Sequence, residues 1–188
     1  MQSNMPTNQV ILVDDYDQPI GQAEKHFAHE QGFLHRAISV VVYRYQPDNG
    51  LEVLMQKRAA CKYHAPNCWS NSCCSHPHPK ESIYDAAHRR LKEELGLTLP
   101  IVYLDRLKYE AKVSETMTEH EIDHIFVARD NGQSIHLNPE EVSDVKWVKL
   151  ADFKSSMQAF KKGHDVSPWC HWVMQVILNH QPKILSLV

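Results

Sequence analysis

The chain has 188 residues, of which 43% are hydrophobic, and a formal net charge of -3 at pH 7. This length and apolar content suffice for one domain with a buried core. No apolar run reaches the roughly 20 residues that span a bilayer, and no basic block marks a surface for nucleic acid or anionic lipid. We therefore expect a globular protein that binds neither nucleic acid nor membrane.

The five cysteines are an odd number, and the N-terminus lacks the basic flank and apolar run of a secretory signal. Disulfides are rare outside oxidising compartments. We therefore expect free thiols and a cytoplasmic location. We also expect a monomer. The expected organisation is a loose segment over residues 1–8, followed by a single domain over residues 9–188.

The first part of the domain predicts strands. Residues 10–21, VILVDDYDQPIG, are typical of a short strand that enters a turn. Residues 37–45 and 51–58 are β-branched or alternating runs, and the Asn49-Gly50 pair between them is a strong hairpin signal. Residues 59–80 predict a long irregular stretch.

Residues 82–96, SIYDAAHRRLKEELG, predict a helix. Ser82 can cap its N-terminus and Gly96 can end it. The apolar residues recur at helical spacing on one side: Ile83, Ala86, Ala87, Leu91 and Leu95.

The remaining elements are three predicted segments of strand and two of helix. Residues 101–113, 120–130 and 144–150 have strand patterns, and residues 151–162 and 168–179 have the apolar spacing of helices. Strands, one helix, more strands and then helices indicate a mixed α/β sandwich.

The charged helix and the segment before it resemble the Nudix box, which runs Gly, five residues, Glu, seven residues, then Arg-Glu-aliphatic-x-Glu-Glu-x-Gly-aliphatic. Seven positions match at the required spacing: Glu81, Arg89, Leu91, Glu93, Glu94, Gly96 and Leu97. Helical spacing alone would also suit a solvated face with ion pairs between successive turns. The resemblance implies a Nudix-type α/β/α sandwich with a mixed sheet and with N-terminal and C-terminal extensions.

Two positions depart from the box, because Ser75 replaces its glycine and Arg90 replaces the first glutamate of Arg-Glu. Nudix hydrolases use that glutamate in a metal cluster that activates water. An arginine cannot ligate a metal ion, but it can hold phosphate oxygens through two parallel hydrogen bonds. We therefore expect a site that holds a diphosphate rather than one that cleaves it.

Residues 71–77, NSCCSHP, and residues 119–123, EHEID, resemble the two signature segments of the type 1 isopentenyl diphosphate isomerase family, Nudix-fold enzymes of isoprenoid synthesis. The match extends from Lys25 to Trp169, and Ser75 fits it. The resemblance implies an intramolecular isomerase that interconverts isopentenyl diphosphate and dimethylallyl diphosphate. A proton is added on one face and removed on the other, through a carbocation-like intermediate.

An unactivated alkene is a poor base, so this reaction needs a strong proton donor and a site that shelters a carbocation from water. The resemblance implies that Cys74 serves one face and Glu121 the other. It adds Tyr109, hydrogen-bonded near Glu121, and Trp169, whose ring can stabilise a cation. By themselves Cys74 would be a small buried thiol and Trp169 a core residue. Cys73 is expected to be the buried thiol of the pair.

Glu119 and Glu121 lie two residues apart on a predicted strand, so both side chains leave the same face. Two carboxylates on a solvated strand would have the same spacing. The family pattern joins them with three imidazoles in one divalent metal site: His29, His35, His76, Glu119 and Glu121. This donor set would accept Mn, Zn, Fe or Mg. The family also implies Mg²⁺ bound between Glu94 and the diphosphate.

The resemblance implies a group of cations that binds the diphosphate of the prenyl substrate: Lys25, Arg58, Lys62 and Arg90. Each of them alone would be an ordinary surface cation. Nine histidines match no family position and are expected to have no role: His26, His64, His78, His88, His124, His136, His164, His171 and His180.

Two other functions compete with the isomerase. A Nudix pyrophosphohydrolase of a nucleoside or prenyl diphosphate is disfavoured by Arg90 and by a cysteine that hydrolysis does not need. A structural zinc module around the Cys-Cys-x-His-x-His run lacks a second cysteine pair at zinc-ligand spacing.

Overall fold

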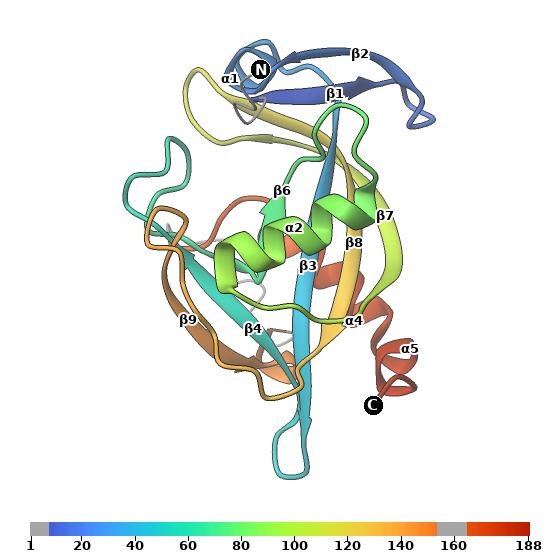
Figure 1. Cartoon of the computed structure of the whole chain (residues 1–188), viewed down its shortest axis with the longest axis vertical. Helices are drawn as coiled ribbons and strands as arrows, with labels where there is room; N and C mark the ends of the chain where they lie inside the picture. Colours follow the sequence, from blue (N-terminus) through green and yellow to red (C-terminus); the bar gives the residue numbers. More distant parts are fainter. Residues whose placement is uncertain (1–7, 154–164) are drawn as a thin grey trace, which may run out of the picture.

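The structure, a computed structural model, describes residues 8–153 and 165–188. A nine-stranded mixed sheet lies among the helices (Figure 1). The strands are β1 Gln9–Val13, β2 Pro19–Glu24, β3 His35–Gln46, β4 Gly50–Arg58, β5 Trp69–Asn71, β6 Cys73–Ser75, β7 Ile101–Lys112, β8 Thr118–Arg129 and β9 Val142–Lys149. The helices are α1 Lys25–Gln31, α2 Ile83–Leu95, α4 Cys170–Asn179 and α5 Gln181–Leu185. None of the helices in the described ranges has the length and apolar content needed to cross a bilayer.

Strand β3 is the centre of the sheet. It pairs antiparallel with β1, β4 and β6, and it pairs in parallel with β8 from His35–Glu121 to Tyr43–Arg129. Strand β8 in turn pairs antiparallel with β7. The mixed sheet predicted from the sequence is confirmed, and its parallel pair is the one that reaches the candidate site.

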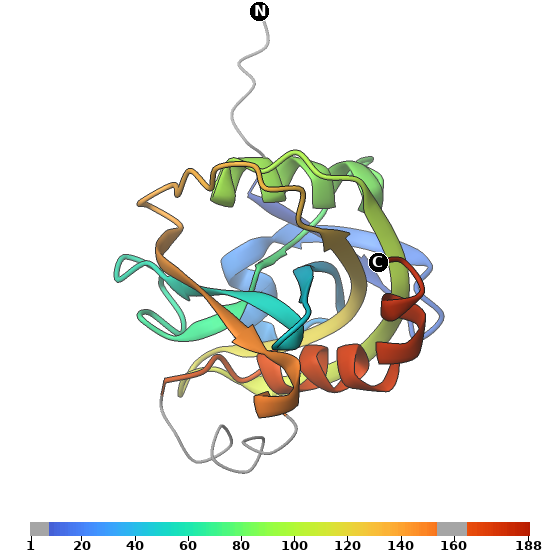
Figure 2. The same cartoon turned by 90° about the horizontal axis from the view of Figure 1, so that it is seen from below.

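The sheet is covered on both faces, and Figure 2 shows α2 and α4 on opposite sides of the strands. Because side chains alternate along a strand, Ile38 and Val40 of β3 pack in the core cluster of α2, whereas Val41 packs in that of α4. Helix α2 contributes Ala86, Ala87, Leu91 and Leu95, and α4 contributes Cys170, Val173, Met174 and Ile177. Burying a Val, Leu or Ile side chain contributes roughly 1.5–3 kcal/mol, so these two cores hold the layers together.

Helix α2 begins and ends where the sequence predicts. Ser82 Oγ accepts a hydrogen bond from the Asp85 N–H at 3.1 Å, and Gly96, with φ of 69°, donates its N–H to the Lys92 carbonyl. A Cβ at position 96 would lie 2.8 Å from the Cβ of His136. Gly96 therefore allows the left-handed backbone that ends α2, and its lack of a side chain leaves room for the segment around His136.

The predicted hairpin at Asn49-Gly50 is also confirmed, since it joins β3 to β4 with Gln46 opposite Gly50. The stretch predicted to be irregular, residues 59–80, contains the short strands β5 and β6, so that prediction is wrong for six residues. The sequence patterns also do not predict α1 or α5. These elements are three to seven residues long, too short for a periodic pattern to emerge.

The helix predicted over residues 151–162 lies mainly outside the described residues, as does the loose segment predicted over residues 1–8. The helix predicted over residues 168–179 is confirmed as α4, which begins at Cys170.

Candidate active site

The register of β6 against β3 separates the two adjacent cysteines. Ser39 pairs with Cys74 and Val40 pairs with Cys73, so the two thiols leave opposite faces of the sheet. Cys73 is fully buried in the core beneath α2 and donates its S–H to Glu94 Oε1 at 3.3 Å. The buried position predicted for Cys73 is confirmed, and Cys74 is left on the other face.

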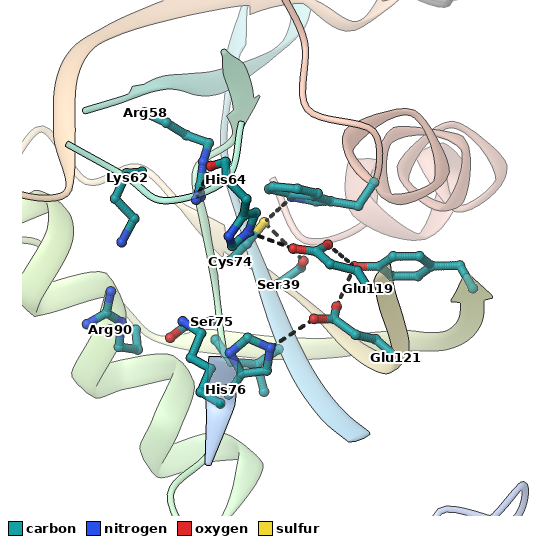
Figure 3. A pocket seen from close by; sticks show the side chains of 14 residues that line it. Ser39, Arg58, Lys62, His64, Cys74, Ser75, His76, Arg90, Glu119 and Glu121 are labelled. Carbon is teal, nitrogen blue, oxygen red and sulfur yellow. Dashed lines mark hydrogen bonds and ion pairs between the residues drawn. The ribbon is translucent and has the colours of Figure 1, made fainter. Parts of the chain in front are cut away.

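Cys74 lines a narrow pocket with a cavity volume of about 30 Å³. Figure 3 shows side chains from several elements directed into this pocket. The lining residues are Lys25, Ile38, Ser39, Arg58, Lys62, His64, Cys74, Ser75, His76, Arg90, Tyr109, Glu119, Glu121 and Trp169. The predicted catalytic residues and the four predicted diphosphate ligands therefore lie around one pocket.

The Cys74 thiol has polar partners on several sides. Its S–H donates to Asn71 Oδ1 at 2.8 Å, and Trp169 donates its indole N–H to the sulfur at 3.2 Å. Ser39 Oγ lies 3.4 Å from the sulfur and donates to Asp123 Oδ2 at 2.8 Å. Burial, with the neighbouring Asp123 carboxyl, raises the pKa of the Cys74 thiol. The group is therefore a protonated thiol at neutral pH.

Glu121 faces Tyr109 across the β7–β8 pair, because the two residues are direct register partners. The Tyr109 hydroxyl donates a short hydrogen bond to Glu121 Oε2 and another to Glu119 Oε2 at 3.3 Å. The Trp172 ring stacks on Tyr109 with centroids 5.0 Å apart. Burial and the two nearby carboxylates raise the pKa of Tyr109, so the phenol keeps the proton that it donates.

Four of the five predicted metal ligands form one group, in which the donor atoms of His29, His35, His76 and Glu121 all lie within 4.8 Å of one another. Backbone carbonyls orient two of the rings, since His29 Nδ1 lies 2.6 Å from the Lys25 oxygen and His35 Nδ1 lies 2.7 Å from the Phe33 oxygen. A histidine whose Nδ1–H is held in this way offers Nε2 to a metal ion.

The converging Nε2 atoms of this group fit a cation. His29 Nε2 is buried and finds no hydrogen-bond partner among the described residues. His35 Nε2 and His76 Nε2 lie 3.2 Å apart, and His76 Nε2 lies 2.8 Å from Glu121 Oε1. Buried polar atoms are normally satisfied, so converging nitrogens beside a carboxylate are what a bound divalent ion would satisfy.

The electrostatics of the group agree with this reading. Burial, with the neighbouring His35, lowers the pKa of His29 to about 4, and burial lowers the pKa of His76 well below its usual range. Burial would raise the pKa of Glu121, but contacts with the His35 and His76 imidazoles outweigh it and hold that pKa low. Neutral imidazoles and an ionised carboxylate are the forms that bind metal.

The fifth predicted ligand, Glu119, lies outside this group, and so does Glu94, which is predicted to bind Mg²⁺ with the diphosphate. Glu119 Oε1 lies 2.7 Å from His64 Nε2, and burial beside the Glu121 charge raises the Glu119 pKa. Glu94 is buried under α2, where it accepts hydrogen bonds from Gln56 at 3.0 Å and from Arg90 at 2.8 Å. Glu119 is linked to the group through Tyr109, whereas Glu94 does not line the pocket and is linked to it through Arg90.

The four predicted diphosphate ligands come from four segments of the chain and line the same pocket: Lys25 of α1, Arg58 of β4, Lys62 of the following loop and Arg90 of α2. Burial and the positive charges of the other three lower the pKa of Lys25 to about 8. Glu141 contacts Lys62 Nζ at 2.6 Å and Arg90 Nη2 at 3.0 Å. Such crowding of cations favours an anionic ligand.

His64 is a member of the site for which the sequence predicts no role. It is 6% exposed, lines the pocket and contacts Glu119. No periodic pattern could have indicated it, because residues 60–67 form turns and bends.

Known proteins resemble the chain in sequence. The NUDIX domain family matches residues 34–172. An isopentenyl-diphosphate Delta-isomerase of Aliivibrio fischeri is 44% identical over 182 residues, which cover 95% of this chain and 99% of that protein. Isopentenyl-diphosphate Delta-isomerase 2 of Aromatoleum aromaticum is 45% identical over 145 residues, which cover 77% of this chain and 74% of that protein.

Solved structures resemble it in fold. DR0079 of Deinococcus radiodurans gives a TM-score of 0.69 at 16% identity, covering 89% of this chain and 97% of that one. The NUDIX domain of Shewanella oneidensis NrtR, complexed with ADP ribose, gives 0.59 at 18% identity, covering 79% and 87%. The Nudix-type fold is thus confirmed, and the chain belongs to the NUDIX family and, within it, to the isopentenyl-diphosphate Delta-isomerases.

Proposed function

We propose that this protein interconverts isopentenyl diphosphate and dimethylallyl diphosphate by adding a proton to one carbon and removing a proton from another. The observation that carries the proposal is that Cys74, Glu121 and Trp169 line one pocket with a cluster of cations. The names of the relatives supply the substrate, isopentenyl diphosphate, and the class of reaction, isomerisation.

The cationic end of the pocket would bind the diphosphate. Lys25 and Arg58 combine with Lys62 and Arg90 to neutralise its charge, and each Arg can make two parallel hydrogen bonds to phosphate oxygens. Fixing this end of a small substrate places its hydrocarbon end near the reacting groups, and such positioning lowers the barrier of a later step.

The proton transfers are assigned to Cys74 on one face of the substrate and Glu121 on the other. Tyr109 holds the Glu121 carboxyl through its hydroxyl, and Asn71 orients the Cys74 thiol. The Trp169 ring can stabilise a developing cation by about 2 kcal/mol when water is excluded. Trp169 is 2% exposed and Glu121 is 4% exposed, so the walls of the pocket are largely dry.

The group of His29, His35, His76 and Glu121 would hold the divalent ion, and Glu119 would complete the donor set. Three imidazole nitrogens favour Mn, Zn or Fe, whereas the carboxylates also admit Mg. When bound, the ion supplies positive charge that lowers the proton affinity of the adjacent carboxyl group. The Mg²⁺ expected at Glu94 with the diphosphate stays a prediction, since Arg90 and Gln56 already bind that carboxylate.

We further expect the protein to act in the cytoplasm as a monomer, on a small prenyl diphosphate, without nucleic acid or membrane as a partner.

The decisive assay incubates the protein with isopentenyl diphosphate and Mn²⁺ or Mg²⁺ and follows the ¹H NMR spectrum. Isomerisation replaces the terminal methylene signals with those of a second methyl group, and the phosphorus spectrum stays that of a diphosphate. Release of phosphate without a new methyl signal would instead establish the competing pyrophosphohydrolase. Metal analysis of the protein before any chelator treatment would identify the ion.

A further inference from the structure

Glu119 is the predicted metal ligand that stands apart from the donor group, and its place is set by an imidazole outside that group. His64 Nε2 lies 2.7 Å from Glu119 Oε1. Both residues are buried, at 6% and 3% exposure. On the other side, Tyr109 donates to Glu119 Oε2 at 3.3 Å. The carboxyl group therefore lies between the Tyr109 hydroxyl and the His64 imidazole, and the imidazole has no role in the proposed reaction.

The orientation of His64 is fixed by its surroundings. Arg58 Nη2 donates to the His64 carbonyl at 3.2 Å. The imidazole packs edge-on against the rings of Tyr63 and Trp169, with centroids 4.3 Å and 5.5 Å away. The next residue, Ala65, has φ of 45°. A non-glycine residue in this left-handed region persists where the surrounding structure holds it there.

These contacts join the two ends of the pocket. Arg58, one of the proposed diphosphate ligands, holds the backbone of residue 64, and the side chain of the same residue holds Glu119. Figure 3 shows His64 between Arg58 and the two glutamates. The loop after β4 thus carries Lys62 toward the phosphate end and His64 toward the carboxylates.

We propose that His64 is a positioning residue that holds Glu119 for the divalent ion of the proposed metal site. The inference depends on that site. Ligating carboxylates in proteins are themselves hydrogen-bonded, and loss of such a partner typically costs 10–100-fold in metal affinity. His64 acts through Glu119, because its Nε2 contacts that carboxyl group at 2.7 Å.

The test measures Mn²⁺ binding to chelator-treated protein by the electron paramagnetic resonance signal of free Mn²⁺. His64→Ala should bind Mn²⁺ about 10–100-fold more weakly. His64→Gln, whose amide N–H can reach the position of Nε2, should recover most of the affinity. His64→Asn is shorter and should not. This series compares variants of similar polarity, so it stays informative if the alanine variant folds poorly.

The matched control is His124→Ala. His124 is also buried, at 5% exposure, and it also pairs with a carboxylate, Asp17, at 3.0 Å, but it does not line the pocket. Its loss should leave Mn²⁺ affinity unchanged. Thermal unfolding in the presence of chelator would show how far each substitution affects the fold without metal.

A double-mutant cycle separates this inference from the metal site itself. Glu119→Gln should weaken Mn²⁺ binding, and adding His64→Ala to it should cause no further loss, because His64 acts through that carboxylate. If Glu119→Gln weakens binding while His64→Ala binds normally, the positioning role is overturned and the metal site stands. If Glu119→Gln also binds normally, Glu119 is not a ligand, so the positioning role is overturned and the metal site is reduced to its four grouped donors.

Discussion

At the level of single residues, the two neighbouring cysteines differ most in what surrounds them. Cys74 faces the pocket among Asn71, Ser39 and Trp169, whereas Cys73 faces the α2 core and Glu94. Successive side chains of a strand leave opposite faces, so the position of each cysteine in the three-residue strand β6 decides which thiol reaches the pocket.

Replacing Cys74 with alanine should abolish most turnover and leave binding nearly intact. A positioned acid–base group contributes typically 10²–10⁴-fold, so kcat should fall by about that factor. The NMR assay would measure the rate, and titration with dimethylallyl diphosphate would measure binding. Cys73→Ala is the control and should retain activity, apart from a loss of stability. An active Cys74→Ala beside an inactive Cys73→Ala would mean that the wrong sulfur had been chosen.

Arg90 is the residue that distinguishes this site from the hydrolase box. Arg90→Glu restores the carboxylate of the box, but it also places a further negative charge beside Glu93, Glu94 and Glu141, the present partners of Arg90. A hydrogen bond to a charged group contributes roughly 1.5–3 kcal/mol, so KM for isopentenyl diphosphate should rise about 10–100-fold.

Lys92→Glu makes the same charge change at an exposed position of α2 and serves as the control. Steady-state kinetics would compare the two variants. An unchanged KM in Arg90→Glu would remove Arg90 from the group that binds the diphosphate.

At the level of elements, the C-terminus of α2 depends on a glycine for two separable reasons. Gly96 has φ of 69°, and its missing Cβ would meet His136 at 2.8 Å. Gly50, in the β3–β4 hairpin, has φ of 70° but open space around the same position. Comparing Gly50 with Gly96 therefore separates the cost of a left-handed backbone from the cost of a steric clash.

Gly50→Ala should destabilise the protein by about 1–2 kcal/mol, the cost of a left-handed L-residue. Gly96→Ala should cost more, because the segment around His136 must also move. Urea unfolding followed by circular dichroism would give both values. Equal losses in the two variants would show that the approach of His136 is easily relieved.

Long elements could be predicted from the sequence because each carries several repeats of its period. Helix α2 and the hairpin at Asn49-Gly50 combine a pattern with a capping or turn residue, and both are confirmed. Strands β5 and β6 have three residues each and are held by pairing with β4 and β3. Pairing of this kind is tertiary information that a local pattern does not contain.

At the level of the whole molecule, Glu141 links the loop before β9 to α2 and to the loop after β4. Burial raises the pKa of Glu141, but Arg90 and Lys62 outweigh burial and lower the pKa to about 2 from its usual 4.5. A carboxyl group whose pKa is lower in the folded state binds fewer protons there than in the unfolded state. Its stabilisation is complete above about pH 4.5 and is lost as the pH falls toward 2.

Glu141→Gln should therefore reduce the free energy of unfolding near pH 6 and flatten its decline between about pH 5 and pH 3. Unfolding curves of the two proteins across this range would test it, and their difference should shrink with acidification. If the two proteins instead lose stability in parallel as the pH falls, Arg90 and Lys62 do not lower the pKa of Glu141 in the folded chain.

The candidate site could be anticipated only through the resemblance of two short segments to a family. That resemblance indicated Lys25 and Trp169, residues far apart in the chain that line one pocket. It did not indicate His64, because the role of that residue depends on how a loop of irregular backbone returns to the sheet. It also did not show that Glu94 is held by Gln56 and Arg90.

The parallel pairing of β3 with β8 has a consequence for how the length of this protein can vary. His35 and Ser39 on one strand, and Glu119 and Glu121 on the other, are odd-numbered residues on one side of the sheet, and Ile38, Val40 and Phe126 fill the other side. Inserting a single residue within either strand would turn every side chain beyond the insertion to the opposite face. Polar groups of the site would then enter the apolar core, and apolar side chains would take their place in the site. Insertions and deletions should therefore be tolerated only where the strands have ended.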